Sequence, residues 1–294
     1  MLSRIAPGAA AVATLVLGGC GSERRSNAPL TDAAATSPAA TVAAATPEIL
    51  TVTASDYKFD APDQIPAGMV TVRLLNRGPS PHHVQLLRLG EGKTPADFQA
   101  AMQKGQLPPW ALPAGGPNPS AVGGTSEVRL PLEAGEYMMV CFIPDTAGVP
   151  HAAHGMVRPL RVTPAVAATA AASADTAADL QVTLVDYDFK LSGPISPGRH
   201  LIRVTNTAQQ PHEVVFVRLE PNKSPQDFAK WGEHQVGPAP GTMHGGVSGI
   251  MPGTVAYVPV DLPAGDYALL CFIPDGKDGK PHYVHGMAKR LKVG

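Results

Sequence analysis

Four residue types that bind transition metals occur in the same order at two places in the chain. The first set is His82, Cys141, His151 and Met156, and the second is His212, Cys271, His282 and Met287. Thiolate and thioether are soft ligands that suit cuprous ion, whereas imidazole also binds cupric ion. Zinc accepts histidine and cysteine but makes no use of a thioether, so each set favours copper over zinc. We predict one copper ion per set, and therefore two per chain.

The local sequence suggests how these residues are positioned. His82 follows a turn at 76–80 and opens an expected strand over 83–89. Cys141 lies in the continuously apolar stretch 137–143, which is typical of a strand buried on both sides. The later histidine and the methionine lie on the loop that follows. One ligand from a distant strand and three from one loop would fix the geometry of the site before metal binds.

A second histidine competes for the later ligand position in each set. His154 and His285 also recur, each separated from the methionine by one residue. We favour His151 and His282, because four intervening residues let imidazole and thioether approach an ion from different directions. His154 and His285 remain the alternative, or they have roles beside the site or toward a partner.

Structural readings of the same residues are also open. A cysteine in an apolar strand is commonly a small core residue, and the methionines can be core fillers. A Cys141–Cys271 disulfide is a further alternative, disfavoured because the two cysteines occupy equivalent positions in separate units. Recurrence of the whole set argues for a site. Four histidines have no counterpart in the other set and are expected to be surface or loop residues: His83, His200, His234 and His244.

The motifs show that the chain is a domain duplication. Asp56-Tyr57-Lys58-Phe59 recurs as Asp186-Tyr187-Asp188-Phe189, and Cys141-Phe142-Ile143-Pro144-Asp145 recurs at 271–275, each 130 positions later. The period is domain-sized, which excludes a solenoid. We place a first copy at 48–163 and a second copy at 179–294, joined by an Ala/Thr/Ser linker at 164–178.

Each copy has the pattern of a β-sandwich. Segments such as 49–53, 70–74 and 128–132 alternate apolar and polar residues, and Gly, Pro, Asn or Asp follows each. One short helix per copy is indicated by an N-cap residue followed by proline, Thr94-Pro95 and Ser224-Pro225. The predicted fold class is all-β: two tandem Greek-key sandwiches of about seven or eight strands, each with a short helical insertion.

Composition narrows the range of partners. The chain of 294 residues contains 30 Gly and 31 Pro, which fits many short strands joined by turns. Its formal net charge is −1 at pH 7. No excess of basic residues is present to bind nucleic acid or to hold the chain electrostatically on an anionic surface.

The first 20 residues have the pattern of a targeting segment. Arg4 precedes an apolar run at 5–17 that is too short to span a bilayer. The run ends in Leu17-Gly18-Gly19-Cys20, which resembles the lipobox of bacterial lipoproteins. That resemblance implies cleavage before Cys20 and lipid on its thiol. We therefore expect a signal peptide at 1–20, a flexible tether at 21–47, and a membrane-anchored protein of the cell envelope outside the cytoplasm. An ordinary cleaved signal is the alternative.

The copies resemble the cupredoxins, the plastocyanin-like type 1 copper proteins. Pro-His at 81–82 and 211–212 is similar to the segment that supplies the first histidine ligand. Gly-Glu-Tyr-x3-Cys and Gly-Asp-Tyr-x3-Cys are similar to the strand that carries the copper thiolate, and His-x4-Met has the spacing of the last two ligands. The resemblance implies the fold and the ligand set given above. This chain departs from plastocyanin in having nine and ten residues between the cysteine and the later histidine.

The surroundings of the cysteines favour electron transfer over catalysis. In copper oxidases and copper nitrite reductases, histidines beside the type 1 cysteine lead to further copper ions. Here Val140 and Phe142 flank one cysteine, and Leu270 and Phe272 the other. We expect a non-enzymatic protein without a small-molecule substrate, passing single electrons to redox partner proteins in the cell envelope. The alternatives are copper storage or delivery, and a metal-free structural sandwich.

Overall fold

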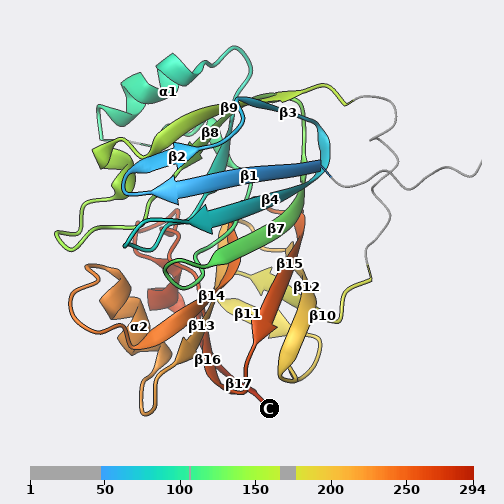
Figure 1. The fold of residues 1–294 in the computed structure, drawn as a ribbon, viewed down its shortest axis with the longest axis vertical. Coiled ribbons are helices and arrows are strands. Elements are labelled where there is room, and N and C mark those ends of the chain that lie inside the picture. The colour runs from blue at the N-terminus through green and yellow to red at the C-terminus, as the bar shows by residue number, and fades with distance from the viewer. Residues whose placement is uncertain (1–47, 106, 166–176) are drawn as a thin grey trace, which may run out of the picture. The chain divides into compact units, whose positions relative to one another are not determined.

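The computed structural model describes residues 48–105, 107–165 and 177–294, which belong to one compact unit (Figure 1). The predicted signal peptide, its Cys20 and the tether lie outside the described residues, as does most of the linker. The division into domains at 48–163 and 179–294 therefore stays a prediction, and the two segments are treated below as copies.

In the first copy, two sheets pack face to face. One has the strand order β2 (Lys58–Asp60), β1 (Glu48–Ser55), β4 (Gly68–Asn76), β7 (Thr125–Leu132). The other has the order β3 (Gln64–Pro66), β9 (Val157–Thr163), β8 (Gly135–Val140), β5 (Gln85–Leu89), β6 (Ala111–Pro113). Side chains from both sheets, among them Leu50, Leu74 and Leu86, form one buried cluster. The expected strand over 83–89 begins later, at Gln85.

The second copy repeats this arrangement. One sheet has the order β11 (Asp188–Leu191), β10 (Leu180–Val185), β12 (Gly198–Asn206), β15 (Val255–Leu262). The facing sheet has the order β14 (Gly241–Ile250), β13 (His212–Leu219), β16 (Gly265–Leu270), β17 (Ala288–Val293). The all-β class with two tandem sandwiches is confirmed. The first copy has nine strands and the second eight in the described residues, the extra one being the very short β3, whose counterpart is only an isolated bridge between Ile195 and Val293.

The apolar stretch before the cysteine is buried on both sides, as its sequence predicts. In β8, Tyr137 and Met139 join the cluster between the sheets. Met138 and Val140 join a second cluster, in which they pack near Phe98 of the helix. The strand ends at Val140, so Cys141 is the first residue of the loop that follows β8.

The helical insertions are also confirmed. Helix α1 spans Pro95–Met102 and α2 spans Pro225–Gly232. Each begins with a capping box, in which Thr94 or Ser224 exchanges hydrogen bonds with an acidic residue three positions later. Proline at the first helical position has no N–H to leave unpaired, so it strengthens the same boundary. Each helix buries a phenylalanine against its sheet.

Both β layers continue from one copy into the other. Strands β7 and β15 pair at Arg129 and Tyr257, which joins two four-stranded sheets into one of eight strands (Figure 1). In the other layer, the segment 114–120 forms antiparallel bridges with β14. Its backbone hydrogen bonds include Gly115 N to Gly249 O and Ser248 N to Gly116 O, both 2.8 Å. Adding or subtracting 130 residues converts each of these backbone hydrogen bonds into another that is also present. A two-fold axis therefore relates the two halves of the junction.

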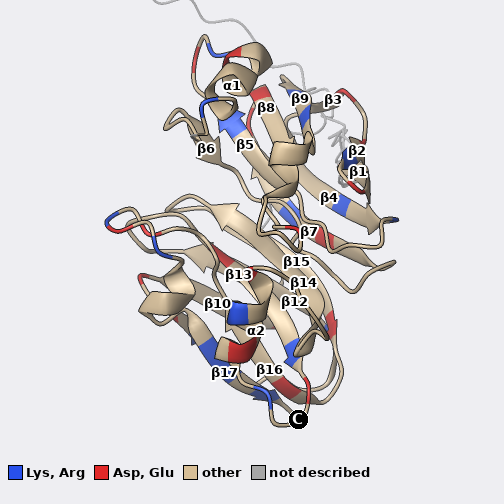
Figure 2. Ribbon diagram, turned by 90° about the vertical axis from the view of Figure 1, so that its left-hand side faces the viewer, with Lys and Arg blue, Asp and Glu red and all other residues tan. Residues whose placement is uncertain are grey.

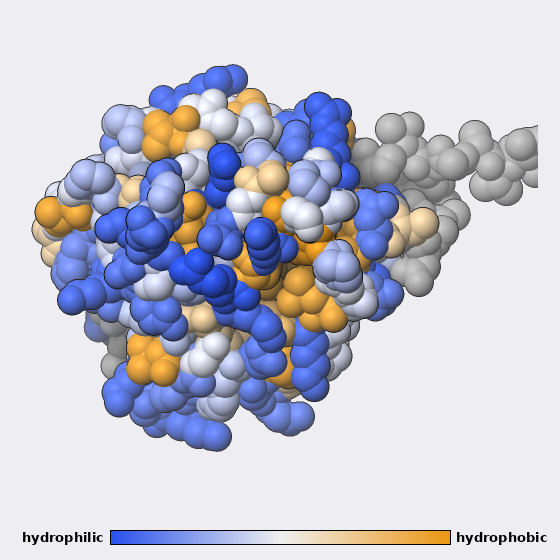
Figure 3. Space-filling view, turned by 90° about the horizontal axis from the view of Figure 1, so that it is seen from below, coloured by the Kyte–Doolittle hydropathy of each residue, from blue (hydrophilic) through white to orange (hydrophobic). Residues whose placement is uncertain are grey.

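The surface carries dispersed charge. Basic and acidic residues are interspersed over both copies, in agreement with the small net charge (Figure 2). Seen from below, hydrophilic residues cover most of the surface and hydrophobic residues form scattered patches (Figure 3). Among the residues that the structure describes, no helix is both long enough and apolar enough to cross a membrane.

Candidate metal centres

Three of the four predicted ligands in the first copy lie together. His82 precedes β5, Cys141 follows β8, and His151 begins the short 3-10 helix η1 (His151–His154). The Nδ1 atoms of His82 and His151 are 3.2 Å apart, and Cys141 Sγ lies 3.5 Å from His151 Nδ1. All three side chains are buried, and their potential ligand atoms lie within 4.8 Å of one another.

The second copy forms the same cluster independently. The Nδ1 atoms of His212 and His282 are 2.9 Å apart. Cys271 Sγ lies 3.4 Å from His282 Nδ1 and 3.9 Å from His212 Nδ1. His282 begins the 3-10 helix η2 (His282–His285). Two imidazoles and one thiol facing a common point from two elements is the donor set of a trigonal copper site.

Backbone hydrogen bonds close the loop that carries the other ligands. Cys141 N donates to Met156 O at 3.2 Å, and His151 N donates to Ile143 O at 2.9 Å. The second copy has the matching bonds from Cys271 to Met287 and from His282 to Ile273, at 3.1 and 2.9 Å. Met156 and Met287 are fully buried in the same cluster as the cysteines. The extra residue of the second loop lies between the bridged prolines Pro274 and Pro281, away from these bonds.

A carboxylate orients the first histidine of each cluster. His82 Nε2 lies 2.8 Å from Asp56 Oδ1, and His212 Nε2 lies 2.9 Å from Asp186 Oδ1. A carboxylate only accepts, so the proton is on Nε2 and Nδ1 presents its lone pair to the cluster. Sequence reasoning gave these aspartates no role, although both stand in a motif that recurs. That recurrence was the signal by which they could have been found.

Burial keeps the imidazoles in the form that binds metal. It lowers the pKa of both His151 and His282 to about 4, with the neighbouring His82 or His212 adding to the effect. Burial also raises the pKa of the Cys141 thiol to about 12 and that of Cys271 well above its usual value. Burial therefore favours the neutral thiol at either position, and a bound cation would favour the thiolate. Both cysteines are free, so the alternative of a Cys141–Cys271 disulfide is wrong.

The competing histidines point elsewhere. His154 Nε2 lies 2.8 Å from Asp145 Oδ2, and its ring packs on Tyr57. His285 Nε2 lies 3.1 Å from Asp278 Oδ1. Both are exposed or partly exposed, whereas His151 and His282 are buried beside the cysteines. The geometry favours the preferred histidines, although the ligand assignment itself stays a prediction.

Alanine variants separate the two candidates in each loop. We expect His151→Ala and His282→Ala to lose the visible absorption of the copper site they belong to, because water replaces an imidazole in the trigonal plane. His154→Ala and His285→Ala should keep it, since each removes an ion pair and a tyrosine contact outside the His/Cys cluster. Copper titration and visible spectra of the four variants measure this. Colour lost in His154→Ala and kept in His151→Ala would reverse the assignment for the first copy.

His83 lies in the loop that precedes β5, which agrees with the expected surface or loop position. It is nevertheless buried, with an exposure of only 9%. Its Nε2 accepts a hydrogen bond from the backbone N–H of Phe142 at 2.9 Å. At the equivalent position of the second copy, Glu213 accepts from Phe272 N–H at 2.8 Å. The two residues differ in type, so a search for identical repeats missed a shared role: each holds the residue that follows the cysteine.

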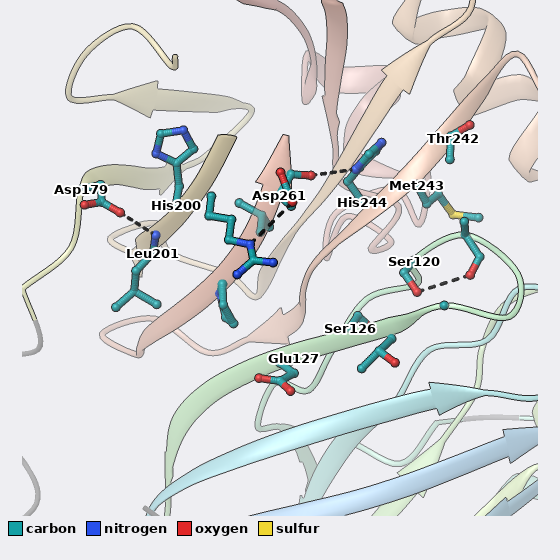
Figure 4. A pocket seen from close by; sticks show the side chains of 16 residues that line it. Ser120, Ser126, Glu127, Asp179, His200, Leu201, Thr242, Met243, His244 and Asp261 are labelled. Carbon is teal, nitrogen blue, oxygen red and sulfur yellow. Dashed lines mark hydrogen bonds and ion pairs between the residues drawn. The ribbon is translucent and has the colours of Figure 1, made fainter. Parts of the chain in front are cut away.

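A broad hollow of about 810 Å³ lies apart from both clusters. It is bordered by residues of β7, β12, β14 and β15. His244 Nδ1 lies 3.0 Å from the backbone oxygen of Asp261, and Asp179 accepts from the N–H of Leu201 (Figure 4). No residue of either His/Cys cluster lines it. The hollow therefore brings no substrate space to the candidate metal centres.

Comparison with known proteins gives structural similarity only. No protein-family model matches the sequence, and no curated protein matches it. One similar structure is dithionite-reduced auracyanin from the photosynthetic bacterium Roseiflexus castenholzii. The match covers 41% of this chain and 99% of the auracyanin chain, at 20% identity and a TM-score of 0.29. Auracyanin B matches 41% and 93%, at 16% identity and a TM-score of 0.30. A multicopper oxidase matches 84% and 88%, at 12% identity and a TM-score of 0.24.

Proposed function

We propose that the chain is an electron-transfer protein with one type 1 copper site in each copy. The observation that carries the proposal is the buried cluster of two Nδ1 atoms and one Sγ atom, formed twice in one chain. His82, Cys141, His151 and Met156 would hold the first ion, and His212, Cys271, His282 and Met287 the second. The soft sulfur donors and the imidazoles together fit an ion that alternates between cuprous and cupric states.

The residues of each cluster suit rapid electron transfer. A bound copper ion would supply a one-electron change of oxidation state. A carboxylate orients the first imidazole of each cluster, and the hydrogen-bonded loop positions the second. All three donor side chains are buried, with at most 1% exposure. A ligand set that is fixed before the ion binds has little to rearrange when the charge of the ion changes.

A hollow of about 520 Å³ borders the first cluster at His151, but neither His82 nor Cys141 lines it. The residues that flank the cysteines are apolar, and each faces a hydrophobic cluster or a neighbouring aromatic ring. Catalysis by a metal ion needs an open coordination position in which a small molecule binds. We therefore favour exchange of electrons with protein partners of the cell envelope over enzymatic turnover.

An optical spectrum with copper quantitation tests the proposal. We expect the chain without residues 1–20 to bind two copper ions and to absorb intensely in the visible, because a thiolate bound to cupric ion gives a strong charge-transfer band. Absence of copper would leave the metal-free structural alternative. Bound copper with slow electron self-exchange would instead favour storage or delivery, since a carrier must cycle quickly and a store need not.

We also propose that the chain is anchored to a membrane of the cell envelope by lipid on Cys20. The support is the motif Leu17-Gly18-Gly19-Cys20 alone. One acyl chain anchors only marginally, whereas the two or three chains of a processed lipoprotein hold stably. Cys20→Ala is expected to release the protein from the membrane fraction or to stall its processing. Fractionation and immunoblotting measure this, and unchanged partitioning of the variant would count against the anchor.

A further inference from the structure

Between the two candidate metal centres runs a continuous chain of buried polar side chains. His83 Nδ1 lies 3.3 Å from Asn118 Oδ1, and Asn118 Nδ2 donates to Glu213 Oε2 at 3.2 Å. The ends of the chain are the hydrogen bonds from Phe142 N to His83 and from Phe272 N to Glu213. Each phenylalanine is joined by one peptide bond to a cysteine of a metal cluster.

The hydrogen atoms along this chain have one consistent arrangement. Phe142 N–H can only donate, so His83 Nε2 accepts and the ring proton lies on Nδ1, from which it is donated to Asn118 Oδ1. The amide of Asn118 then donates to the carboxylate of Glu213, which also accepts from Phe272 N–H. All four hydrogen bonds are thus satisfied at once, without a break or a conflict between donors.

The position of Asn118 is what makes the connection possible. It belongs to the segment 114–120 that pairs with β14, and its own N–H donates to Gly246 O at 3.1 Å. The second hydrogen of its side-chain amide has a partner in Val214 O at 3.2 Å. With 1% exposure it is held from both copies and shielded from water. The equivalent position of the second copy carries Ser248, whose single hydroxyl proton lies between Val84 O and Gly116 O, each 3.0 Å from Oγ, and which makes no hydrogen bond to His83, Asn118 or Glu213.

We propose that His83, Asn118 and Glu213 form an internal electron path that joins the two copper sites. The proposal rests on the function proposed above. A copper ion held in each cluster would supply the donor and the acceptor, so that oxidation of cuprous to cupric ion in one copy would balance reduction of cupric to cuprous ion in the other. No proton moves and no further reactant is needed. Hydrogen bonds and covalent bonds connect the two cysteines throughout, so the electron does not have to cross the apolar hollow of about 450 Å³ that these residues border.

The charges around the two centres give the path a direction. In the second copy, the buried Asp275 places Oδ2 3.7 Å from His282 Nε2. In the first copy, the equivalent Asp145 pairs with the exposed His154 instead. A buried negative charge stabilises the more highly charged cupric ion. Electrons are therefore expected to settle on the first copy.

The test is a pulse-reduction experiment on the full, copper-loaded chain in detergent. A short pulse of reductant reduces a fraction of the sites, and absorption then follows the redistribution of electrons. The single-site variants Cys141→Ser and Cys271→Ser supply the spectrum of each site alone. We expect a phase whose rate is independent of protein concentration and that ends with the first copy reduced. Two loaded, redox-active sites without such a phase would overturn the path and leave the proposed function intact.

Asn118→Ser is the decisive variant, because serine is the natural residue at the equivalent position and is too short to reach both neighbours. We expect it to lose most of the concentration-independent phase while keeping both copper ions and their colour. Ser248→Ala is the matched control, since it removes buried hydrogen bonds at the same junction without touching the path, and it should keep the phase. A phase of unchanged rate in Asn118→Ser would overturn the proposal.

A second measurement does not depend on copper. In the metal-free chain, the amide protons of Phe142 and Phe272 should be protected from hydrogen exchange, because both are bonded to buried acceptors. Asn118→Ser should speed the exchange of Phe142, whose acceptor His83 loses the partner that orients its ring. Rapid exchange of both amides in the unaltered chain would show that the path is not formed, and would overturn the proposal even if the variant fails to bind copper.

Discussion

Replacing Cys141 with serine is expected to remove about half of the visible absorption of the copper-loaded chain, and Cys271→Ser the other half. Serine has nearly the same shape, but its hydroxyl does not supply the soft anionic sulfur on which the charge-transfer band depends. The double variant should be colourless. Visible spectra with copper quantitation of the three variants measure this, and copper content and colour that survive the double substitution would show that the ligand assignment is wrong.

A matched control separates the loss of a ligand from damage to the core. Met138 lies three residues before Cys141 on β8, but its side chain belongs to the cluster near α1 and not to the one that contains the cysteine. Met138→Leu conserves volume, which typically costs less than about 1.5 kcal/mol. It should therefore leave both colour and copper content unchanged. Equal loss of colour in this control would mean that any disturbance of β8 destroys the site.

Gly116→Ala and Gly246→Ala are expected to destabilise the chain by about 3 kcal/mol or more each, because strain and overpacking add. Both glycines have a φ near +135°, at +133° and +138°, which side chains rarely adopt. A Cβ atom at Gly116 would lie 2.0 Å from the backbone oxygen of Val84, and one at Gly246 would lie 2.0 Å from that of Val214. Backbone must move to admit either methyl group. Chemical denaturation of the metal-free chain measures the free energy of unfolding.

Gly198→Ala is the control for these variants. Its φ of +121° is in the same region, but no heavy atom lies within 4 Å of the Cβ position. Its free energy of unfolding should fall only by the cost of the backbone conformation, about 1–2 kcal/mol. If Gly116→Ala proves as stable as Gly198→Ala, the close approach of Gly116 to the backbone of Val84 within the first copy is not tight in solution.

Recurrence in the sequence was the reason that the fold and the clusters could be anticipated. The period of two in strands such as β1, the capping signals before α1, and the order of histidine, cysteine, histidine and methionine all appear twice. The preference for His151 over His154 rested only on the number of residues between each histidine and Met156. The structure places His151, which is buried, beside Cys141. That inference needed local geometry alone, which the sequence supplies.

The connection between the copies was not predictable in the same way. The segment 114–120 contains Gly115, Gly116, Pro117 and Pro119, a composition that indicates turns. It nevertheless pairs with β14 through its backbone, because a strand of the other copy supplies the hydrogen bonds that its own sheet does not. Roles that depend on such distant pairing, as for His83 and Asn118, leave no periodic pattern. The one sequence feature that points to this pairing is the pair of adjacent glycines at 115–116, which recurs at 245–246.

The two-fold pairing of the segment 114–120 with β14 also bears on how the duplicated chain arose. Each is the edge of its own sheet, and an uncovered edge presents unpaired N–H and C=O groups that attract other chains. Since each hydrogen bond of the junction has a counterpart from the other copy, two molecules of a single copy have the surfaces to form the same contact as a symmetric homodimer. Fusing them makes that association intramolecular, so it no longer weakens on dilution. It also frees the two halves to diverge, with histidine at position 83 of one and glutamate at position 213 of the other, which no homodimer of identical subunits can do.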